Sequence, residues 1–336
     1  MTNRRYLLLV NPASGTRRGL VALEQVKPVF AAADAELDVR ITERSGHARR
    51  LAQTLDLAAY NGLCLIGGDG TVHEVVSGLL ERGQPVSIPL GIIPAGTGND
   101  VAKQLGISSP LEAAQQIIAG RTSPFDVAKV EANGDTDYCV TLVGWVGVAE
   151  INCTAERLRM LGPPRYAVAA LWQILFPKRR RARLVLDDQV FDDDFLLVIA
   201  CNTVFSGSGM RLAPRAKVDD GKIDVVILRN ATRWQLFRLF AKVFDGSHVE
   251  MPCVEYHQVR SLSILSDDGL PLDLDGEIKG TAPVSIQIIP GAVRMFCEDS
   301  AHFSKTSSQT CNIDRGHASI TSGEGVASST EDFAPG

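Results

Sequence analysis

The chain has 336 residues, with 34 Lys and Arg against 39 Asp and Glu, so its formal net charge is −5. At roughly 150 residues per domain, this length suggests about two domains and excludes a small disulfide scaffold. Charged residues make up 22% and hydrophobic residues 45% of the chain, which excludes a disordered chain and a polytopic membrane protein. The negative net charge argues against nucleic acid as a partner of the whole protein.

The seven cysteines are spaced singly, without the close pairs of zinc sites or disulfide frameworks, so we expect reduced thiols that lie mostly in the core. Near the start of the chain, the apolar run at residues 6–10 is too short for the core of a signal peptide or for a membrane span. The expected location is therefore cytoplasmic.

The first 125 residues alternate between short apolar runs and segments with helical periodicity. Strands are expected at residues 6–10, 39–42, 62–66 and 89–93, and helices at 20–32, 48–59, 71–80, 99–105 and 110–119. This alternation predicts an α/β domain with a Rossmann-like, mostly parallel sheet and helices on both faces over residues 1–125.

From residue 126 the pattern changes to short strands separated by polar turns. The expected strands are residues 127–131, 138–143, 183–186, 195–200, 223–228, 261–265, 284–289 and 292–296, and the expected helices are 165–176 and 234–244. This pattern predicts a β-sandwich domain over residues 126–300, and a return of its last strand to the first domain is left open. Residues 301–336 are rich in Ser, Thr and Gly, which predicts a disordered tail.

Three turns each follow a predicted parallel strand, so they are expected to meet at one edge of the sheet. They are N-P-A-S-G at residues 11–15, G-G-D-G-T-V at 67–72 and P-A-G-T-G-N-D at 94–100. Glycine lets the backbone approach a ligand closely, and the N–H groups at a helix N-terminus favour phosphate. Helix capping in a tight turn explains each motif taken singly, so the prediction of a phosphate site depends on their shared location.

Within these turns, Asp69 places an acid where anions are expected to bind. This arrangement makes sense if a cation such as Mg²⁺ mediates, or if the carboxylate accepts a proton from an attacking hydroxyl. In the third turn, Gly96 and Gly98 flank Thr97, and Asn99 is a candidate helix cap. Neither a Walker motif nor the H-R-D set of protein kinases occurs in the chain.

Two further acidic turns complete the set of motifs. In chain order, the motifs are N-P-x-S-G at residues 11–15, G-G-D-G-T-V-x-E-V-V-x-G-L at 67–79, P-x-G-T-x-N-D at 94–100, D-D-G-K-I-D at 219–224 and D-G-E at 275–277. Together they resemble the diacylglycerol kinase catalytic-domain family, which includes bacterial lipid kinases and has sphingosine and ceramide kinases as relatives. The resemblance covers roughly residues 5 to 298.

The resemblance implies an ATP-binding α/β domain, a β-sandwich domain and an active site in the cleft between them. By position, the residues expected to bind the nucleotide are Asn11, Ser14, Thr42, Gly67, Gly68, Asp69, Gly70, Thr71, Val72, His73, Thr97 and Asn99. Similar proteins commonly carry Asn at the position of His73, which leaves this one contact open.

The resemblance also implies roles for the acidic turns. Asp220 is expected to anchor a Mg²⁺ site, with backbone carbonyls from Lys217 and Lys222, and either Glu277 or Asp275 is expected to be the general base, with Asp69 on the nucleotide and metal side. Taken alone, each acidic turn is most simply a hairpin turn.

The predicted helix at residues 165–176 is rich in large apolar side chains, and five basic residues follow within positions 178–183. Such a helix suits peripheral contact with an anionic bilayer, at the inner face of the membrane. A core-packed helix followed by a solvated basic turn explains the pattern equally well.

These observations predict an ATP- and Mg²⁺-dependent lipid kinase. It is expected to transfer the γ-phosphoryl group to the hydroxyl of a diacylglycerol-like, phosphatidylglycerol-like or sphingoid lipid at the membrane surface. The alternatives are an NAD kinase, since those proteins also carry G-G-D-G-T, and a non-catalytic nucleotide-binding regulator. No nucleic-acid partner is expected, and a homodimer is left open.

Overall fold

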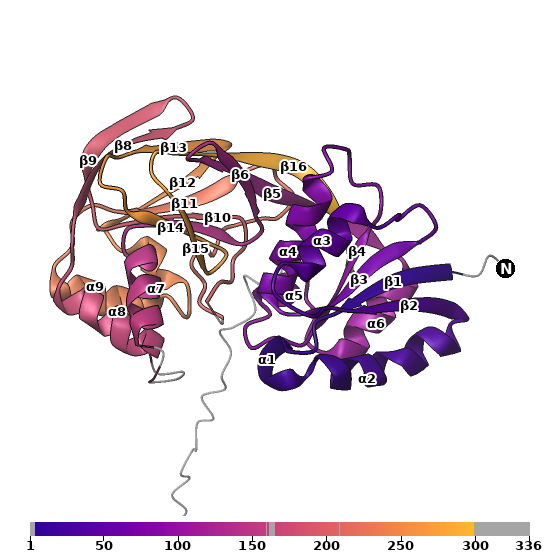
Figure 1. Ribbon diagram of the computed structural model, residues 1–336. Helices are drawn as coiled ribbons and strands as arrows, with labels where there is room; N and C mark the ends of the chain where they lie inside the picture. Colours follow the sequence, from indigo (N-terminus) through magenta and orange to yellow (C-terminus); the bar gives the residue numbers. More distant parts are fainter. Residues whose placement is uncertain (1–3, 159, 161–164, 208, 299–336) are drawn as a thin grey trace, which may run out of the picture.

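The computed structural model describes residues 4–158, 160, 165–207 and 209–298. The predicted tail at residues 301–336 lies outside the described residues. Within them the chain forms a ten-stranded and a six-stranded sheet with helices packed around both (Figure 1). The predicted fold class, an α/β part followed by a β-sandwich, is confirmed.

The N-terminal part is built on four parallel strands in the order β2-β1-β3-β4. Every residue of β3 and β4 is buried, as expected for apolar strands covered on both faces. Helices α2 and α6 pack together on one face, and α3 and α4 on the other (Figure 1). The bounds are β1 Arg4–Val10, α1 Ser14–Arg17, α2 Gly19–Ala32, β2 Ala35–Ile41, α3 His47–Thr54, β3 Gly62–Gly67, α4 Asp69–Leu80, β4 Leu90–Pro94, α5 Asp100–Gln104 and α6 Pro110–Ala119.

The C-terminal part is a sandwich of the antiparallel six-stranded sheet β12-β11-β10-β7-β14-β15 and the far half of the ten-stranded sheet. Its core contains Trp145 and Phe195, both fully buried. The bounds are β5 Thr122–Ala132, β6 Asp135–Cys139, β7 Leu142–Trp145, α7 Val148–Arg157, α8 Arg165–Leu175, β8 Arg180–Leu186, β9 Gln189–Phe195, β10 Leu197–Cys201, β11 Ile223–Leu228, α9 Arg233–Lys242, β12 Val254–Val259, β13 Ser261–Leu265, β14 Pro271–Leu274, β15 Glu277–Thr281 and β16 Val284–Phe296.

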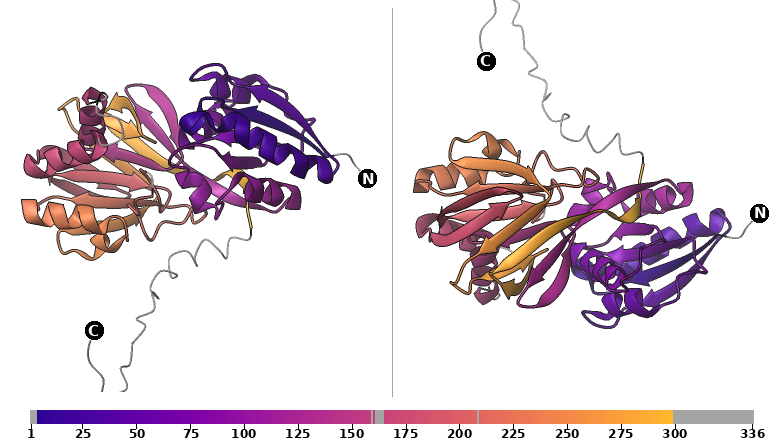
Figure 2. Two further views of the ribbon diagram at one scale, coloured as in Figure 1. Left: turned by 90° about the horizontal axis from the view of Figure 1, so that it is seen from below. Right: turned by 90° about the horizontal axis from the view of Figure 1, so that it is seen from above.

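Strand β16 joins the two parts. It pairs with β5 along most of its length and with β13 in the sandwich, and near its end Met295 pairs with Leu90 of β4. The ten-stranded sheet is therefore continuous from the N-terminal part into the sandwich, and Figure 2 shows β16, in yellow, running between them. Residues 284–289 and 292–296, expected as two strands, are one strand with an irregularity between Ile289 and Val293.

Several elements differ from the expectation for local reasons. Residues 138–143 form two strands instead of one, because the backbone N–H groups of Val140, Thr141 and Leu142 donate to the carboxylate of Asp275 and not to a neighbouring strand. The predicted basic turn after α8 continues as strand β8. Helix α7 and strands β9, β12 and β15 were not predicted, since their sequences are polar or irregular in period.

A candidate nucleotide site between the glycine turns and Glu277

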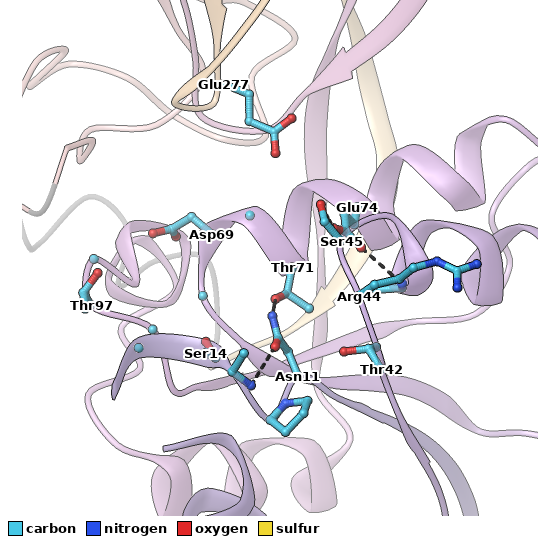
Figure 3. Close-up of a pocket in the computed structure, with 18 of the residues that line it drawn as sticks. Asn11, Ser14, Thr42, Arg44, Ser45, Asp69, Thr71, Glu74, Thr97 and Glu277 are labelled. Carbon is cyan, nitrogen blue, oxygen red and sulfur yellow. Dashed lines mark hydrogen bonds between the residues drawn. The ribbon is translucent and has the colours of Figure 1, made fainter. Parts of the chain in front are cut away.

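A cavity of about 540 Å³ opens at the carboxyl ends of the parallel strands. Its floor is formed by the three glycine turns, and Glu277 on β15 lies on the opposite wall, with its carboxylate directed toward the start of α4 (Figure 3). The lining residues are Asn11, Pro12, Ala13, Ser14, Gly15, Thr42, Glu43, Arg44, Ser45, Ala48, Gly68, Asp69, Gly70, Thr71, Glu74, Gly96, Thr97, Gly98 and Glu277.

The glycine turns contact one another through their backbones. A Cβ atom on Gly96 would lie 2.6 Å from the Cα atom of Gly68, closer than real side chains come. At Gly15, where φ is +59°, a Cβ atom would lie 2.6 Å from the carbonyl oxygen of Ala95. The absence of side chains at these positions therefore allows the three turns to lie against each other.

Asn11 connects the first turn to the second. Its Nδ2 donates to Oγ1 of Thr71 at 3.0 Å, and its Oδ1 accepts from the backbone N–H of Ala13 at 3.0 Å. The side chain thus fixes the loop after β1 against the first turn of α4 (Figure 3).

Most of the predicted nucleotide-binding residues line this cavity, but four do not: Gly67, Val72, His73 and Asn99. Val72 is buried in the core of the N-terminal part. Asn99 closes its own turn, because Oδ1 accepts from the N–H of Gly96 at 2.8 Å and Nδ2 donates to the carbonyl of Gly96 at 2.9 Å.

The segment from Glu43 to Ser45 and the side chain of Glu74 were missed. This segment follows β2, another parallel strand, so the rule that located the three turns would have found it. Glu74 orders this wall, because its two carboxylate oxygens accept from the backbone N–H groups of Gly46 at 2.8 Å and Ala48 at 3.1 Å.

Asp69 is half-buried at the N-terminus of α4, where its Oδ1 accepts from the N–H of Val101 at 3.0 Å. The pKa of this carboxyl is raised overall, chiefly by burial. The N–H donors of residues 100 and 101 lower this pKa, and the negative charges of Asp100 and Asp275 raise it. A carboxyl with a raised pKa in a cavity is a candidate for binding a cation or for proton transfer.

Asp275 lies outside the cavity and is almost completely buried. Its Oδ1 accepts from the N–H groups of Thr141 at 2.7 Å and Leu142 at 3.1 Å, and its Oδ2 accepts from the N–H of Val140 at 2.8 Å. Burial would raise the pKa of this carboxyl, but these donors and His73 lower it well below the ordinary value. Asp275 is therefore a buried anion that fixes the turn between β14 and β15.

His73 makes the contact between this turn and the N-terminal part. Its Nδ1 lies 2.9 Å from Oδ2 of Asp275, and its Nε2 lies 3.9 Å from Oδ1 of Asp137, which also pairs with Lys279 at 2.7 Å. Burial would lower the pKa of His73, but the hydrogen bond to Asp275 and the charges of Asp275 and Asp137 raise it overall. His73 thus contacts the hairpin that carries Glu277.

Glu277 is the first residue of β15, and its side chain is about half exposed to the cavity side of the hairpin. Oε2 lies 3.5 Å from Nζ of Lys279. Of the two acidic residues predicted for proton acceptance, the structure places Glu277 at the cavity and encloses Asp275 among hydrogen-bond donors.

The residues predicted to hold Mg²⁺ do not line the cavity. Lys217, Asp220 and Lys222 belong to the loop before β11, where Oδ1 of Asp220 accepts from the N–H of Lys222 at 3.0 Å. This loop packs against Asp126, and the pKa of Asp126 is raised overall. Burial raises this pKa most, N–H donors lower it, and the negative charges of Asp220 and Asp219 raise it further. Among the described residues, no three acidic, His or Cys side chains gather as a metal cluster.

Two family models match the chain in succession. The model described as diacylglycerol kinase catalytic domain matches residues 5–130, and the one described as YegS C-terminal NAD kinase beta sandwich-like domain matches residues 144–297. A curated diacylglycerol kinase of Staphylococcus haemolyticus is 30% identical over 83% of this chain and 83% of its own length. The chain belongs to the diacylglycerol kinase catalytic-domain family, and it is an enzyme of this lipid kinase family.

Sphingosine kinase 1 of Arabidopsis thaliana is 26% identical over 96% of this chain and 76% of its own length. Among solved structures, a candidate diacylglycerol kinase from Bacillus anthracis has a TM-score of 0.74 at 27% identity, over 89% of this chain and 99% of that one. An NAD kinase from Archaeoglobus fulgidus in complex with ATP has a TM-score of 0.52 at 12% identity and so shows the fold alone.

The close contact between the glycine turns predicts the effect of a single methyl group. Gly96→Ala should lower the free energy of unfolding by about 1 to 3 kcal/mol, because the turns must move apart to accommodate the Cβ atom. Gly70→Ala is the matched control: no atom lies within 4 Å of its Cβ position, so its effect should stay within about 0.5 kcal/mol. Equal losses in urea unfolding of both variants would contradict the contact.

The raised pKa of His73 predicts a pH-dependent contribution to stability. Below its ordinary pKa of about 6.5 the protonated ring stabilises the fold through Asp275, and this stabilisation is lost as the pH rises through the raised pKa. His73→Asn keeps a neutral donor, so it should cost about 1 to 2 kcal/mol in acid and progressively less as the pH rises.

Urea unfolding of wild type and His73→Asn at several pH values checks this prediction. His257→Asn, on the sandwich strand β12, controls for the loss of a histidine elsewhere. A cost of His73→Asn that does not change with pH would show that protonation of this ring does not stabilise the fold.

Proposed function

We propose that this protein is an ATP- and Mg²⁺-dependent kinase that phosphorylates the hydroxyl of a lipid, of the diacylglycerol-like, phosphatidylglycerol-like or sphingoid class. The observation that carries the proposal is the position of Glu277, across the cavity from three turns whose backbones suit phosphate (Figure 3). Membership of the lipid kinase family and the names of the relatives support the choice of acceptor.

In this proposal the glycine turns bind the phosphates of ATP. The N–H groups come from the N-terminus of α4 at Asp69 and Gly70 and from Thr97 and Gly98 of the third turn, since the N–H of Gly96 is bonded to Asn99. Arg44 brings a positive charge to the wall of the same cavity. Phosphoryl transfer depends mainly on positioning and on stabilising charge, and these groups supply both.

Glu277 accepts the proton of the acceptor alcohol. The hydroxyl oxygen forms a bond to the γ-phosphorus, the bond from that phosphorus to the β–γ bridging oxygen breaks, and ADP leaves with the electron pair. The hydroxyl proton passes to the carboxylate of Glu277, which faces the cavity. Asp275 takes no proton, because its oxygens are occupied by N–H donors, and it acts by fixing the turn.

The loop 217–222 is the proposed Mg²⁺ site. Asp219 and Asp220 bring negative charge close to buried Asp126, which accepts from the N–H of Gly221 in the same loop, and a cation here would be held by Asp220, by the carbonyls of Lys217 and Lys222, and by water. When bound there, Mg²⁺ would compensate these negative charges and keep the loop in place. Asp69, at the cavity itself, is the residue placed to meet a cation carried by the nucleotide.

The role of Glu277 is tested by Glu277→Gln. This variant keeps the size and polarity of the side chain but cannot accept the proton, so turnover should fall by about 10² to 10⁴ while the KM for ATP stays unchanged. Transfer of labelled phosphate from ATP to lipid in detergent micelles is the measurement. Glu131→Gln, an exposed glutamate on β5, should behave like wild type, and an unreduced turnover of Glu277→Gln would refute the assignment.

The role of Asp220 is tested by Asp220→Asn. If Mg²⁺ binds this loop, the melting temperature of wild type rises with Mg²⁺ concentration, and Asp220→Asn should need about ten-fold more Mg²⁺ for the same rise. Asp188→Asn, in the exposed turn between β8 and β9, is the control. The same Mg²⁺ response in Asp220→Asn and wild type would exclude this site.

A further inference from the structure

Helices α8 and α9 expose large apolar side chains of the kind that a soluble protein normally buries. Among the described residues, eight of the sixteen exposed large apolar side chains lie within residues 165–176 and 233–244. The two helices pack against each other at the end of the sandwich remote from the N-terminal part (Figures 1 and 2). The exposed apolar side chains of these two neighbouring helices, together called the apolar face of α8 and α9, are chiefly Leu171, Trp172, Leu175, Phe176, Trp234 and Phe237.

Helix α8 carries one stripe of large apolar side chains that faces outward. Val168, Leu171, Trp172 and Leu175 recur at helical spacing on one stripe, and each is more than 40% exposed. Among the side chains of α8 that the structure describes, the buried ones are the small Ala169 and Ala170. An amphipathic helix on a soluble protein normally packs its large apolar stripe inward, so this orientation indicates that something else covers the stripe.

Helix α9 repeats the arrangement. It has no buried residue, and Trp234 and Phe237 lie on one exposed stripe with their rings stacked 5.9 Å apart. Trp234 is 67% exposed and Trp172 on α8 is 56% exposed. Amphipathic aromatic side chains of this kind are favoured at the interface of a bilayer with water.

The two helices themselves carry only basic charges, while the acidic side chains nearest to α8 belong to α7, where Glu156 pairs with Arg165. No Asp or Glu occurs in residues 157–186 or in residues 225–244. Lys178, Arg179, Arg233 and Arg238 are exposed there, and Arg179 donates to Asn230, which links the end of α8 to the start of α9. The later residues of the predicted basic run are balanced: Arg180 pairs with Glu150 and Arg181 with Asp192 on the sandwich.

We propose that the apolar face of α8 and α9 docks on an anionic lipid bilayer, with the aromatic side chains in the acyl–headgroup boundary and the basic side chains at the headgroups. The two helices carry no acidic residue, and the neighbouring Glu150 and Glu156 of α7 are paired with Arg180 and Arg165, so the exposed Lys178, Arg179, Arg233 and Arg238 make the charge of this face complementary to an anionic membrane. No helix of the described residues is long and apolar enough to cross a bilayer. This docking surface rests on the proposed function in one respect: a lipid acceptor in the membrane gives the protein a reason to bind the membrane.

Co-sedimentation with vesicles tests the docking directly. Wild type should bind vesicles of phosphatidylglycerol and phosphatidylcholine in equal amounts, bind pure phosphatidylcholine more weakly, and dissociate as salt is raised. Trp172→Glu on α8 and Phe237→Glu on α9 should each reduce binding to the mixed vesicles by about ten-fold or more. Val190→Glu, which places the same charge on an exposed apolar residue of β9, should bind like wild type.

Three results would overturn the docking surface: no binding of wild type to the mixed vesicles, unchanged binding of Trp172→Glu and Phe237→Glu, or self-association that these two variants abolish while vesicle binding persists. Melting temperatures show whether the variants fold.

Phosphorylation of lipid in detergent micelles tests the function separately. Activity in micelles with no vesicle binding refutes only the docking surface, and vesicle binding with no activity on any lipid refutes only the function.

Discussion

The buried carboxylate of Asp275 is the contact on which the geometry of the site depends. A buried charge is tolerated only when hydrogen-bond donors satisfy it, and here backbone N–H groups at residues 140–142 and the ring of His73 do so. The donors come from the sandwich and from α4, so one carboxylate ties the β14–β15 turn to both parts of the molecule. Glu277, two residues further, is thereby held over the glycine turns while strands β5 and β16 carry the sheet across the junction.

Much of the cavity floor could be predicted from the sequence, because it depends on local patterns. Buried apolar runs identified the parallel strands, and the carboxyl ends of such strands meet at one edge, which brought the glycine turns together. Helical periodicity also explains why Thr71 and Glu74 face the cavity while Val72 and His73 face away, although motif membership alone had grouped Thr71, Val72 and His73. The same rule also predicts that residues 43–45, which follow β2, line the cavity, and this segment was missed.

The remaining features depend on contacts between distant residues. Nothing local to the D-G-E turn shows that Asp275 is enclosed by residues 140–142 while Glu277 reaches the cavity, so the sequence left both as candidates for the base. The same holds for α8, where the pattern of apolar residues predicts a helix but not the side that faces the sandwich. In the structure the side with Trp172 faces outward while Ala169 and Ala170 are buried, an orientation that the helix sequence does not specify.

The central claim is that the cavity transfers the γ-phosphoryl group of ATP to a lipid hydroxyl placed against Glu277. The most direct test incubates the protein with labelled ATP, Mg²⁺, a total lipid extract and NAD in one reaction, followed by mass spectrometry of every labelled product. The account predicts label in a lipid whose hydroxyl has gained a phosphate, and none in that lipid with Glu277→Gln. Label confined to phosphorylated NAD, or nucleotide binding with no labelled product, would contradict it.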